Sequence, residues 1–413
     1  MPGRVLARAG VLLLVLLAIG AALSAYPAYL NGDLRYAYAG AVLVLAALLP
    51  TVRAWPALRP IGTSAALLIA LNLATTPWLR DAAPTLSHNY SARVEIVGDV
   101  MPGFTGVQTI NTDEKGYRTN VAVDYRHKSP DTVRIFAVGA STTEQIALGN
   151  DKTWVTHMAA LIEEKTGRRV EAVNTGVAGL RARHHLATLR RIEAYAPDLV
   201  IVMMGVNDWN RHIKTRGNPY FLAFYDVVEQ FDLRESLFAQ AYRGVHTILT
   251  ALDPASPTSG PRQDDGSYFS RQNDSLNRPV QQAFFPREIS ENYRSHALRI
   301  VEFCRLHDLH CLLVDQATAY DPAIEPHLRK RLWMTPPNEA YTLTLENMAY
   351  IADLYNSSLR EITASAGLPF CGISRQVPPT TASFYDDCHF NEPGARAVAR
   401  LISDCILAQK LVH

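Results

Sequence analysis

The sequence predicts an α/β protein in which a parallel sheet of about five strands is covered by helices on both faces. From Thr132 onward, short runs rich in valine and isoleucine alternate with longer amphipathic segments. The short runs are apolar throughout, as expected of strands that are buried on both faces of a parallel sheet. A further observation concerns residues 1–80, which are mostly apolar and predict helices that cross a membrane.

The membrane prediction rests on three runs that carry almost no charge, Ala9 to Tyr26, Tyr36 to Val52 and Ile61 to Leu79. Each is close to the roughly 20 residues that cross a bilayer as a helix. For the first run, a cleaved signal peptide is the alternative. For the second and shortest run, the alternative is a re-entrant or interfacial segment, which would leave two crossings and a cytoplasmic domain. We expect three spans.

Positive charges predict the orientation of these spans. Arg4 and Arg8 precede the first span and Arg53 and Arg59 lie between the second and third, whereas the loop between the first two has only Arg35. Lysine and arginine are retained on the cytoplasmic side of short loops, so the amino terminus is expected inside. In a bacterium, the protein would sit in the inner (cytoplasmic) membrane with everything after the third span in the periplasm or otherwise outside the cytoplasm.

Charge and cysteine content narrow the function classes. With 40 basic and 39 acidic residues, the chain has almost no net positive charge that would attract nucleic acid. We therefore exclude nucleic acid as a partner. The five cysteines all lie in the last third, and an odd number cannot be fully paired within one chain. One or two disulfides are possible in an oxidising compartment, and the spacing does not choose between pairings.

Three regions follow from these patterns. Residues 1–80 are the membrane anchor, residues 81–131 an extended linker or strand-rich lead-in with turn signals, and residues 132–413 the α/β domain. The domain contains a long insertion at about 210–287, whose polar stretch rich in proline, serine and glycine predicts a mobile loop. Strands are expected at Val133 to Val138, Val170 to Asn174, from Asp198, from Cys311 and near Pro369, and helices at Trp154 to Lys165, Leu180 to Tyr195, Ile289 to Leu306, Tyr341 to Ala366 and after Pro393.

Small and polar residues stand where these elements end. Ser141 follows the first strand in Gly-Ala-Ser-Thr-Thr, Gly179 follows the second and Asn207 the third, while Asp386 and His389 occur near the end of the chain. Ligands bind beyond the carboxyl ends of parallel strands, where the loops converge. A serine nucleophile needs a base, a carboxylate that orients the base, and donors for the oxyanion. The four blocks supply these parts.

The order of the blocks, with serine first and Asp-x-x-His last, resembles the SGNH hydrolases, also called the GDSL esterase and lipase family. The resemblance implies a flavodoxin-like three-layer α/β/α sandwich over residues 132–413. It implies that Ser141 is the nucleophile, His389 the general base and Asp386 the orienting carboxylate, with Asp387 as a competitor. The N–H groups of Ser141 and Gly179 and the side-chain amide of Asn207 would form the oxyanion hole. Alanine stands where the family has the aspartate of Gly-Asp-Ser, which bears on substrate class.

Two other clusters have residue types that can bind ligands. Cys304, His307, His310 and Cys311 are zinc-ligand types, but they span a helix end and a strand start, and we expect no metal there. The segment Arg181 to His185 opens the helix after Gly179, where an anionic-substrate contact and a solvated helix face are both open.

These observations predict a membrane-anchored serine esterase with no metal and no organic cofactor. Its expected substrates are ester-linked acyl groups, above all O-acetyl groups, of cell-envelope or exported polysaccharide. Transfer of acetyl groups to the same glycans, or hydrolysis of lipid esters, are the alternatives within enzymes. A non-catalytic module that binds or assembles glycans is the alternative of another class.

Overall fold

A six-stranded sheet with the strand order β3-β5-β4-β6-β8-β9 lies at the centre of the computed structural model. The strands are β3 (Arg118–Thr119), β4 (Thr132–Val138), β5 (Arg169–Asn174), β6 (Leu199–Met203), β8 (Cys311–Val314) and β9 (Phe370–Cys371). All except β3 are parallel, and their order corresponds to the 2-1-3-4-5 order of flavodoxin-like sheets. The predicted set of five parallel strands is therefore confirmed. The edge strand β3 was not predicted. Because β3 is antiparallel to β5, the sheet is mixed.

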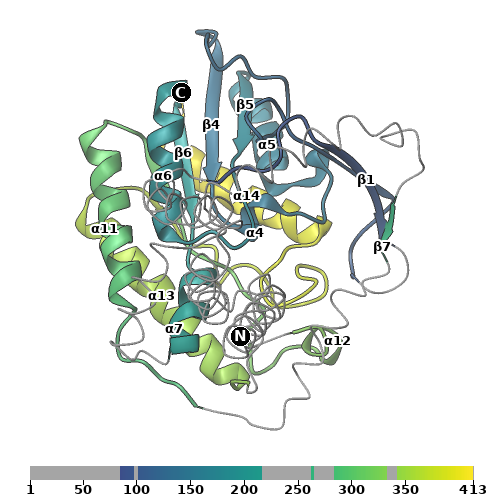
Figure 1. Cartoon of the computed structure of the whole chain (residues 1–413), viewed down its shortest axis with the longest axis vertical. Coiled ribbons are helices and arrows are strands. Elements are labelled where there is room, and N and C mark those ends of the chain that lie inside the picture. Colours follow the sequence, from purple (N-terminus) through teal and green to yellow (C-terminus); the bar gives the residue numbers. More distant parts are fainter. Residues whose placement is uncertain (1–83, 97–100, 216–261, 265–282, 333–341, 413) are drawn as a thin grey trace, which may run out of the picture. The chain divides into compact units, whose positions relative to one another are not determined.

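The structure describes residues 84–96, 101–215, 262–264, 283–332 and 342–412, which are coloured in Figure 1 and belong to one compact unit. The three predicted membrane spans and most of the predicted insertion lie outside these residues, so both stay predictions. Within the described ranges, no helix combines the length and the apolar character needed to cross a bilayer.

Helices pack in two groups, and the path of the chain explains why (Figure 1). The chain runs from β4 outward to β5 and then back past β4 to β6, β8 and β9, and right-handed crossovers in opposite directions lie on opposite faces of a sheet. Accordingly α5 packs against α14, whereas α11 packs against α6 and α13. The α-helices are α4 (Ser141–Glu144), α5 (Trp154–Thr166), α6 (Ala182–Ile192), α7 (Val206–Thr215), α11 (Glu291–Leu306), α12 (Pro326–Arg329), α13 (Leu345–Ser365) and α14 (Glu392–Ala408).

The mostly apolar composition of the two central strands, β4 and β6, suits them to the middle of the sheet. Every residue of β4 and of β6 is buried, as expected of strands with helices on both faces. Arg134 of β4 is charged and still only 1% exposed. Its guanidinium pairs with Glu171 of β5 at 2.7 Å and donates to the carbonyls of Tyr195 and Asp124, so the buried charge is compensated.

Capping side chains set where the helices begin. Thr153, Ser290, Thr344 and Asn391 each accept a hydrogen bond from the N–H three residues further on, at the starts of α5, α11, α13 and α14. Two 3₁₀ turns, Asn150–Lys152 and Glu193–Tyr195, precede α5 and follow α6. The helices predicted from periodicity are all present, with ends displaced by a few residues.

The segment before β4 forms a second, smaller sheet. Its strands β1 (Ser91–Ile96) and β2 (Val107–Asn111) are antiparallel, and β7 (Arg262–Asp264) pairs in parallel with β1. Strands were one of the two predicted readings of this region, the other being an extended linker.

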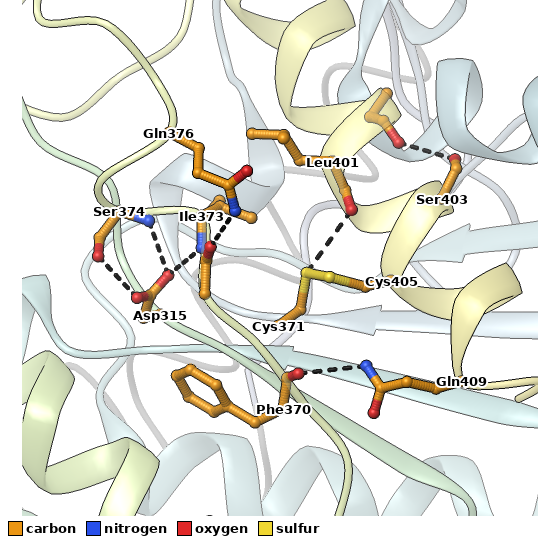
Figure 2. The surroundings of a disulfide bond; sticks show 12 residues. Asp315, Phe370, Cys371, Ile373, Ser374, Gln376, Leu401, Ser403, Cys405 and Gln409 are labelled. Atoms are coloured by element: carbon orange, nitrogen blue, oxygen red, sulfur yellow. Dashed lines mark hydrogen bonds between the residues drawn. A yellow bond between two sulfur atoms is a disulfide. The ribbon is translucent and has the colours of Figure 1, made fainter.

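Four of the five cysteines are paired. Cys304 at the end of α11 is bonded to Cys311 at the start of β8, and Cys371 of β9 is bonded to Cys405 of α14. Cys388 is free and buried. Figure 2 shows the second bridge beside Asp315, whose carboxylate accepts the backbone N–H groups that follow β9. The bridge thus joins β9, the edge strand opposite β3, to the last helix, α14.

Candidate active site

Ser141 lies at the junction of β4 and the short helix α4, next to the point where the strand order reverses. Gly139 is needed at this turn, because a Cβ there would lie 2.0 Å from Thr143 Oγ1 and 2.9 Å from the Met203 carbonyl of β6. Thr142 is held on both sides, since its Oγ1 bonds Gln316 Oε1 at 3.0 Å and its carbonyl accepts from Trp154 Nε1 at 3.1 Å. The residues after Ser141 in α4 are buried, whereas Ser141 itself is partly exposed.

The structure brings His389 to Ser141 across 248 residues of sequence. The distance from His389 Nε2 to Ser141 Oγ is 2.8 Å. On the other side of the ring, Nδ1 is 2.7 Å and 2.9 Å from the two carboxylate oxygens of Asp386. An ionised carboxylate can only accept, so Nδ1 carries a hydrogen, and in the neutral ring Nε2 can accept a hydrogen bond from the Ser141 hydroxyl. The side chains of His389 and Asp386 are 16% and 2% exposed.

The loop that carries His389 is braced along its length. Backbone N–H groups of Cys388 and His389 donate to Asp386 Oδ1 at 3.0 Å and 2.9 Å, which orients the carboxylate. The ring of Tyr385 stacks on the imidazole, with 5.6 Å between ring centroids. Asn391 donates its side-chain amide to the carbonyls of Pro102 and Thr381 at 3.0 Å and 2.6 Å. These contacts leave the imidazole little freedom to turn away from the serine.

Opposing effects act on the proton affinity of His389. Burial by itself lowers the pKa of His389, whereas the adjacent Asp386 carboxylate, with Cys388 and Tyr385, raises it. The net result is a pKa well above the ordinary value for histidine. The site therefore stabilises the protonated imidazolium form of His389.

Asp386, which the family resemblance favours as the orienting carboxylate, and its competitor Asp387 have different partners. Asp386 contacts the imidazole, as described above. Asp387 is fully buried and hydrogen-bonds the side chain of Tyr320. Its backbone carbonyl accepts from the Ala319 N–H at 2.8 Å, which joins this loop to the segment after β8.

The two other predicted oxyanion donors follow β5 and β6. Gly179 has φ +80, is exposed, and has an N–H with no hydrogen-bond acceptor among the described residues. Asn207, the second residue of α7, donates one amide hydrogen to the Leu180 carbonyl at 2.8 Å, so its side chain lies against the Gly179 loop. A side-chain amide has two hydrogens, and the second remains for a ligand.

The helix that follows this loop corrects one of the sequence expectations. Arg181, Arg183, His184 and His185 are all buried, so the reading of this segment as a solvated face is wrong. The carboxylate of Asp208 accepts from the Ala182 N–H at the start of α6. Burial raises the pKa of Asp208 to about 6, although Arg181, the Ala182 N–H, Arg211 and Arg183 all act to lower it.

The cluster of zinc-ligand types is also resolved. Cys304 and Cys311 are bonded to each other, so their sulfurs are not metal ligands in this state. The two cysteines meet although one is at a helix end and the other at a strand start. His307 pairs with Glu193 at 2.6 Å. Among the described residues, one group has the spacing of metal ligands, namely Asp386, Cys388 and His389. In this group, Asp386 and His389 are hydrogen-bonded to each other.

Two residues of the site were not singled out from sequence. Glu144, three positions after Ser141, is 4% exposed and accepts the Ala178 N–H at 2.5 Å. Arg118 of β3 is 2% exposed, and its guanidinium donates to the carbonyls of Glu144, Gln145 and Leu148 that follow the serine. Both residues stand among polar neighbours in the sequence, so nothing in the sequence marked them as buried or revealed their partners.

Part of the domain is similar to a known protein family. Residues 137–284 match the model of the GDSL-like Lipase/Acylhydrolase family, a range that includes Ser141, Gly179 and Asn207 but ends before Asp386. A search of curated protein sequences found no match. Solved structures similar to the chain include an acetylxylan esterase from Geobacillus stearothermophilus, at 15% identity and a TM-score of 0.37 over 68% of this chain and 96% of that one. A GDSL-like lipase from Bacteroides thetaiotaomicron has 14% identity and a TM-score of 0.34 over 70% and 94%. Residues 137–284 are therefore similar to GDSL-like lipases and acylhydrolases, and this match supports an ester-hydrolysing enzyme.

Proposed function

We propose that the enzyme works through an acyl-enzyme formed on Ser141. The observation that carries this proposal is the 2.8 Å contact between Ser141 Oγ and His389 Nε2, with Asp386 bonded to the other ring nitrogen. A serine hydroxyl is a weak nucleophile near neutral pH, and a paired imidazole makes its attack on an ester fast.

In the first half of the reaction, Ser141 Oγ attacks the ester carbonyl carbon while its proton passes to His389 Nε2. The carbonyl electron pair moves to oxygen, and the N–H groups of Ser141 and Gly179 and the free amide hydrogen of Asn207 bind the resulting oxyanion. The bond to the leaving alcohol then breaks. His389 returns its proton to that alcohol, and the acyl group stays on Ser141.

In the second half, a hydroxyl compound takes the acyl group from Ser141. His389 removes a proton from the attacking oxygen, and the same donors bind the second oxyanion. Collapse of this intermediate breaks the bond to Ser141 Oγ, which recovers its proton from His389. If the attacking molecule is water the product is a free acid, and if it is a sugar hydroxyl the product is a new ester.

The proposed substrates are O-acetyl groups of cell-envelope or exported polysaccharide, and the proposed location is the outer side of a bacterial inner membrane. Three apolar runs before residue 80 and the distribution of arginines around them support a membrane anchor of this orientation. The two disulfides support an oxidising compartment, because cytosolic thiols are kept reduced. An anchored enzyme outside the cytoplasm would meet O-acetylated envelope glycans, and it would also meet the ester bonds of phospholipids.

A fluorophosphonate probe tests the nucleophile. It should label the intact protein at Ser141, and labelling should fall sharply in His389→Ala, where the serine is present but has no base. Ser141→Ala is the control and should not be labelled. If a folded preparation showed no labelling at Ser141 and no acyl release or transfer with several classes of ester, the acyl-enzyme would be refuted in favour of a glycan-binding module.

Acetylated glycans test the substrate and the reaction type. The protein is incubated with an acetylated polysaccharide, with and without an unacetylated acceptor, and products are followed by mass spectrometry. We expect free acetate in both reactions. Acetate found on the acceptor would reassign the enzyme as a transferase, and turnover of phospholipid alone would replace the glycan with a lipid substrate.

Reporter fusions test the location. A reporter that is active only outside the cytoplasm should be active when fused after His413 and inactive when fused between Arg53 and Arg59. An inactive fusion after His413 would contradict the envelope assignment.

A further inference from the structure

Glu144 is a buried ionisable residue of the site that the reaction above does not use. It is the last residue of α4, three positions after the proposed nucleophile, and is 4% exposed. Its Oε2 accepts a hydrogen bond from the Ala178 N–H at 2.5 Å. Ala178 immediately precedes Gly179, the proposed oxyanion donor.

The loop from Thr175 to Gly179 is attached to the nucleophile's own segment at successive points. The N–H groups of Thr175 and Val177 donate to the carbonyls of Ala137 and Gly139, at 2.9 Å and 3.4 Å. The Ala178 N–H, further along the loop, donates a hydrogen bond to the Glu144 carboxylate. This hydrogen bond is the last of these contacts before the backbone turns at Gly179. There φ is +80, and the Gly179 N–H has no hydrogen-bond acceptor among the described residues.

The packing of the loop shows that its path is tight at the same place. A Cβ on Gly176 would lie 2.3 Å from the Glu144 backbone nitrogen, so the loop and α4 are in direct backbone contact. Asn174 ties the two together as well, because its side chain donates to the Thr143 carbonyl at 2.6 Å and accepts the Gly176 N–H at 2.9 Å. The Glu144 side chain extends this junction by two residues, to the position next to the oxyanion donor.

We propose that Glu144 is a positioning residue that holds the Ala178 N–H and thereby aims the Gly179 N–H at the oxyanion. The inference rests on the proposed function. The contact requires an acceptor oxygen at the reach of a glutamate, and it does not require the negative charge. Glu144 makes no hydrogen bond to Ser141 or His389, although its carboxylate interacts electrostatically with His389. The proposed positioning effect passes through the loop.

Three substitutions separate reach from charge. Glu144→Gln keeps an oxygen at the same reach and removes the charge, so we expect a kcat within a few-fold of wild type. Glu144→Asp keeps the charge but is one methylene shorter, and Glu144→Ala removes both. For these two we expect kcat to fall towards the ~10²–10³-fold that loss of one oxyanion donor produces, with little change in KM.

Glu171→Ala is the matched control. Glu171 is also a buried glutamate in a polar contact, but it pairs with Arg134 at the centre of the sheet and touches neither α4 nor the loop. It should lower the melting temperature and leave kcat of the folded protein unchanged. Glutamine and aspartate are close in size to glutamate, so these two variants give an answer even if Glu144→Ala does not fold.

The outcomes are distinct. An active Gln variant with an impaired Asp variant supports the proposal. An active Asp variant with an impaired Gln variant overturns it, because charge would then be the requirement. Equal activity in all variants, or equal loss in all, also overturns it. If the wild-type protein itself neither hydrolyses esters nor reacts with the fluorophosphonate, the proposed function has failed, and that result is separate from any ranking of Glu144 variants.

Discussion

His389 is the residue on which the site converges, because both ring nitrogens and one face of the ring have a defined neighbour. Nε2 meets the serine, Nδ1 meets Asp386, and one face of the ring stacks on Tyr385. A ring held in this way has lost most of its conformational freedom before substrate binds. This preorganisation lets proton transfer proceed without a search for geometry.

The two adjacent aspartates should therefore behave differently when neutralised. Asp386→Asn removes the charge that holds Nδ1–H, and we expect kcat to fall by about 10⁴-fold, as for other triad carboxylates. Asp387→Asn weakens a buried hydrogen bond to Tyr320, so it should lower stability by about 1–3 kcal/mol while kcat stays within roughly tenfold. Ester turnover and thermal melting of both variants provide the measurements, and equal effects on kcat would contradict the assignment.

The raised pKa of His389 predicts the pH dependence of the reaction. The imidazole accepts the serine proton only when it is neutral, and below its pKa it is already protonated. The value of kcat/KM should therefore fall as the pH is lowered through a midpoint well above the 6.5 of an ordinary histidine. In Asp386→Asn the carboxylate no longer raises the pKa, so the midpoint of the residual activity should move to lower pH. A wild-type midpoint at or below 6.5 would be inconsistent with the charged pair.

At the scale of elements, the site is a junction between short segments that long elements hold in place. Helix α4 has four residues, too few to be stable alone, and it is fixed by β4 before it, by the Arg118 guanidinium and by the loop after β5. Helix α14 anchors the histidine loop in a similar way. Its residue Glu392 accepts from the Thr105 N–H of the lead-in segment, and it pairs with Lys152, just before α5, at 2.7 Å.

Substitution of two glycines should have different effects, because Gly176 packs against α4 of the site and Gly167 ends helix α5. Gly176→Ala places a Cβ 2.3 Å from the Glu144 backbone nitrogen, so the loop and α4 must separate and kcat should fall markedly. Gly167→Ala at the end of α5 meets open space and only adds the strain of φ +70, which costs about 1–2 kcal/mol. The Gly167 variant should melt earlier with unchanged kcat. Both are assayed at a temperature where they are folded, and unchanged kcat in Gly176→Ala would refute the packing argument.

At the scale of the whole molecule, the disulfides divide into a short local bridge and a longer one. Cys304–Cys311 closes a separation of 7 residues, and Cys371–Cys405 closes one of 34 between β9 and α14 (Figure 2). The longer bridge also spans the segment that carries Asp386 and His389. A cross-link restricts the unfolded chain more when the loop it closes is longer.

Removal of the two bridges should lower stability to different extents. Loop entropy predicts a loss of about 4 kcal/mol for Cys371→Ala with Cys405→Ala and about 2 kcal/mol for Cys304→Ala with Cys311→Ala. Urea unfolding of the three proteins under non-reducing conditions measures the difference. A greater loss for the shorter bridge would mean that strain or packing, rather than chain entropy, dominates.

The pairing also predicts the number of free thiols. Five cysteines with two bridges leave Cys388 alone, so protein that is denatured without reductant should take up one maleimide per chain. After reduction it should take up five. Cys388→Ser is the control and should take up none before reduction. Five thiols in unreduced protein isolated from cells would argue against an oxidising compartment.

The sequence by itself determined the elements and the blocks of the site. Strands such as β4 and β6 could be predicted because burial on both faces requires a continuous apolar run, which is a local property of the chain. Ser141, Gly179 and Asn207 could be predicted to lie at one edge of the sheet, because each follows the carboxyl end of a parallel strand. Helix ends were within a few residues for the same local reason, since caps and breakers are read along the chain.

Only the tertiary structure decided which side chains meet. Asp386 and Asp387 are the same residue type in adjacent positions, and the backbone path of the loop alone determines that the first faces His389. The pairing of four cysteines, the two-residue strand β3 and the contact of Glu144 with Ala178 depend on segments that are far apart in sequence or too short to have a pattern. Burial of Arg181 to His185 likewise comes from elements packed around α6. Such contacts depend on three-dimensional proximity, which local periodicity does not encode.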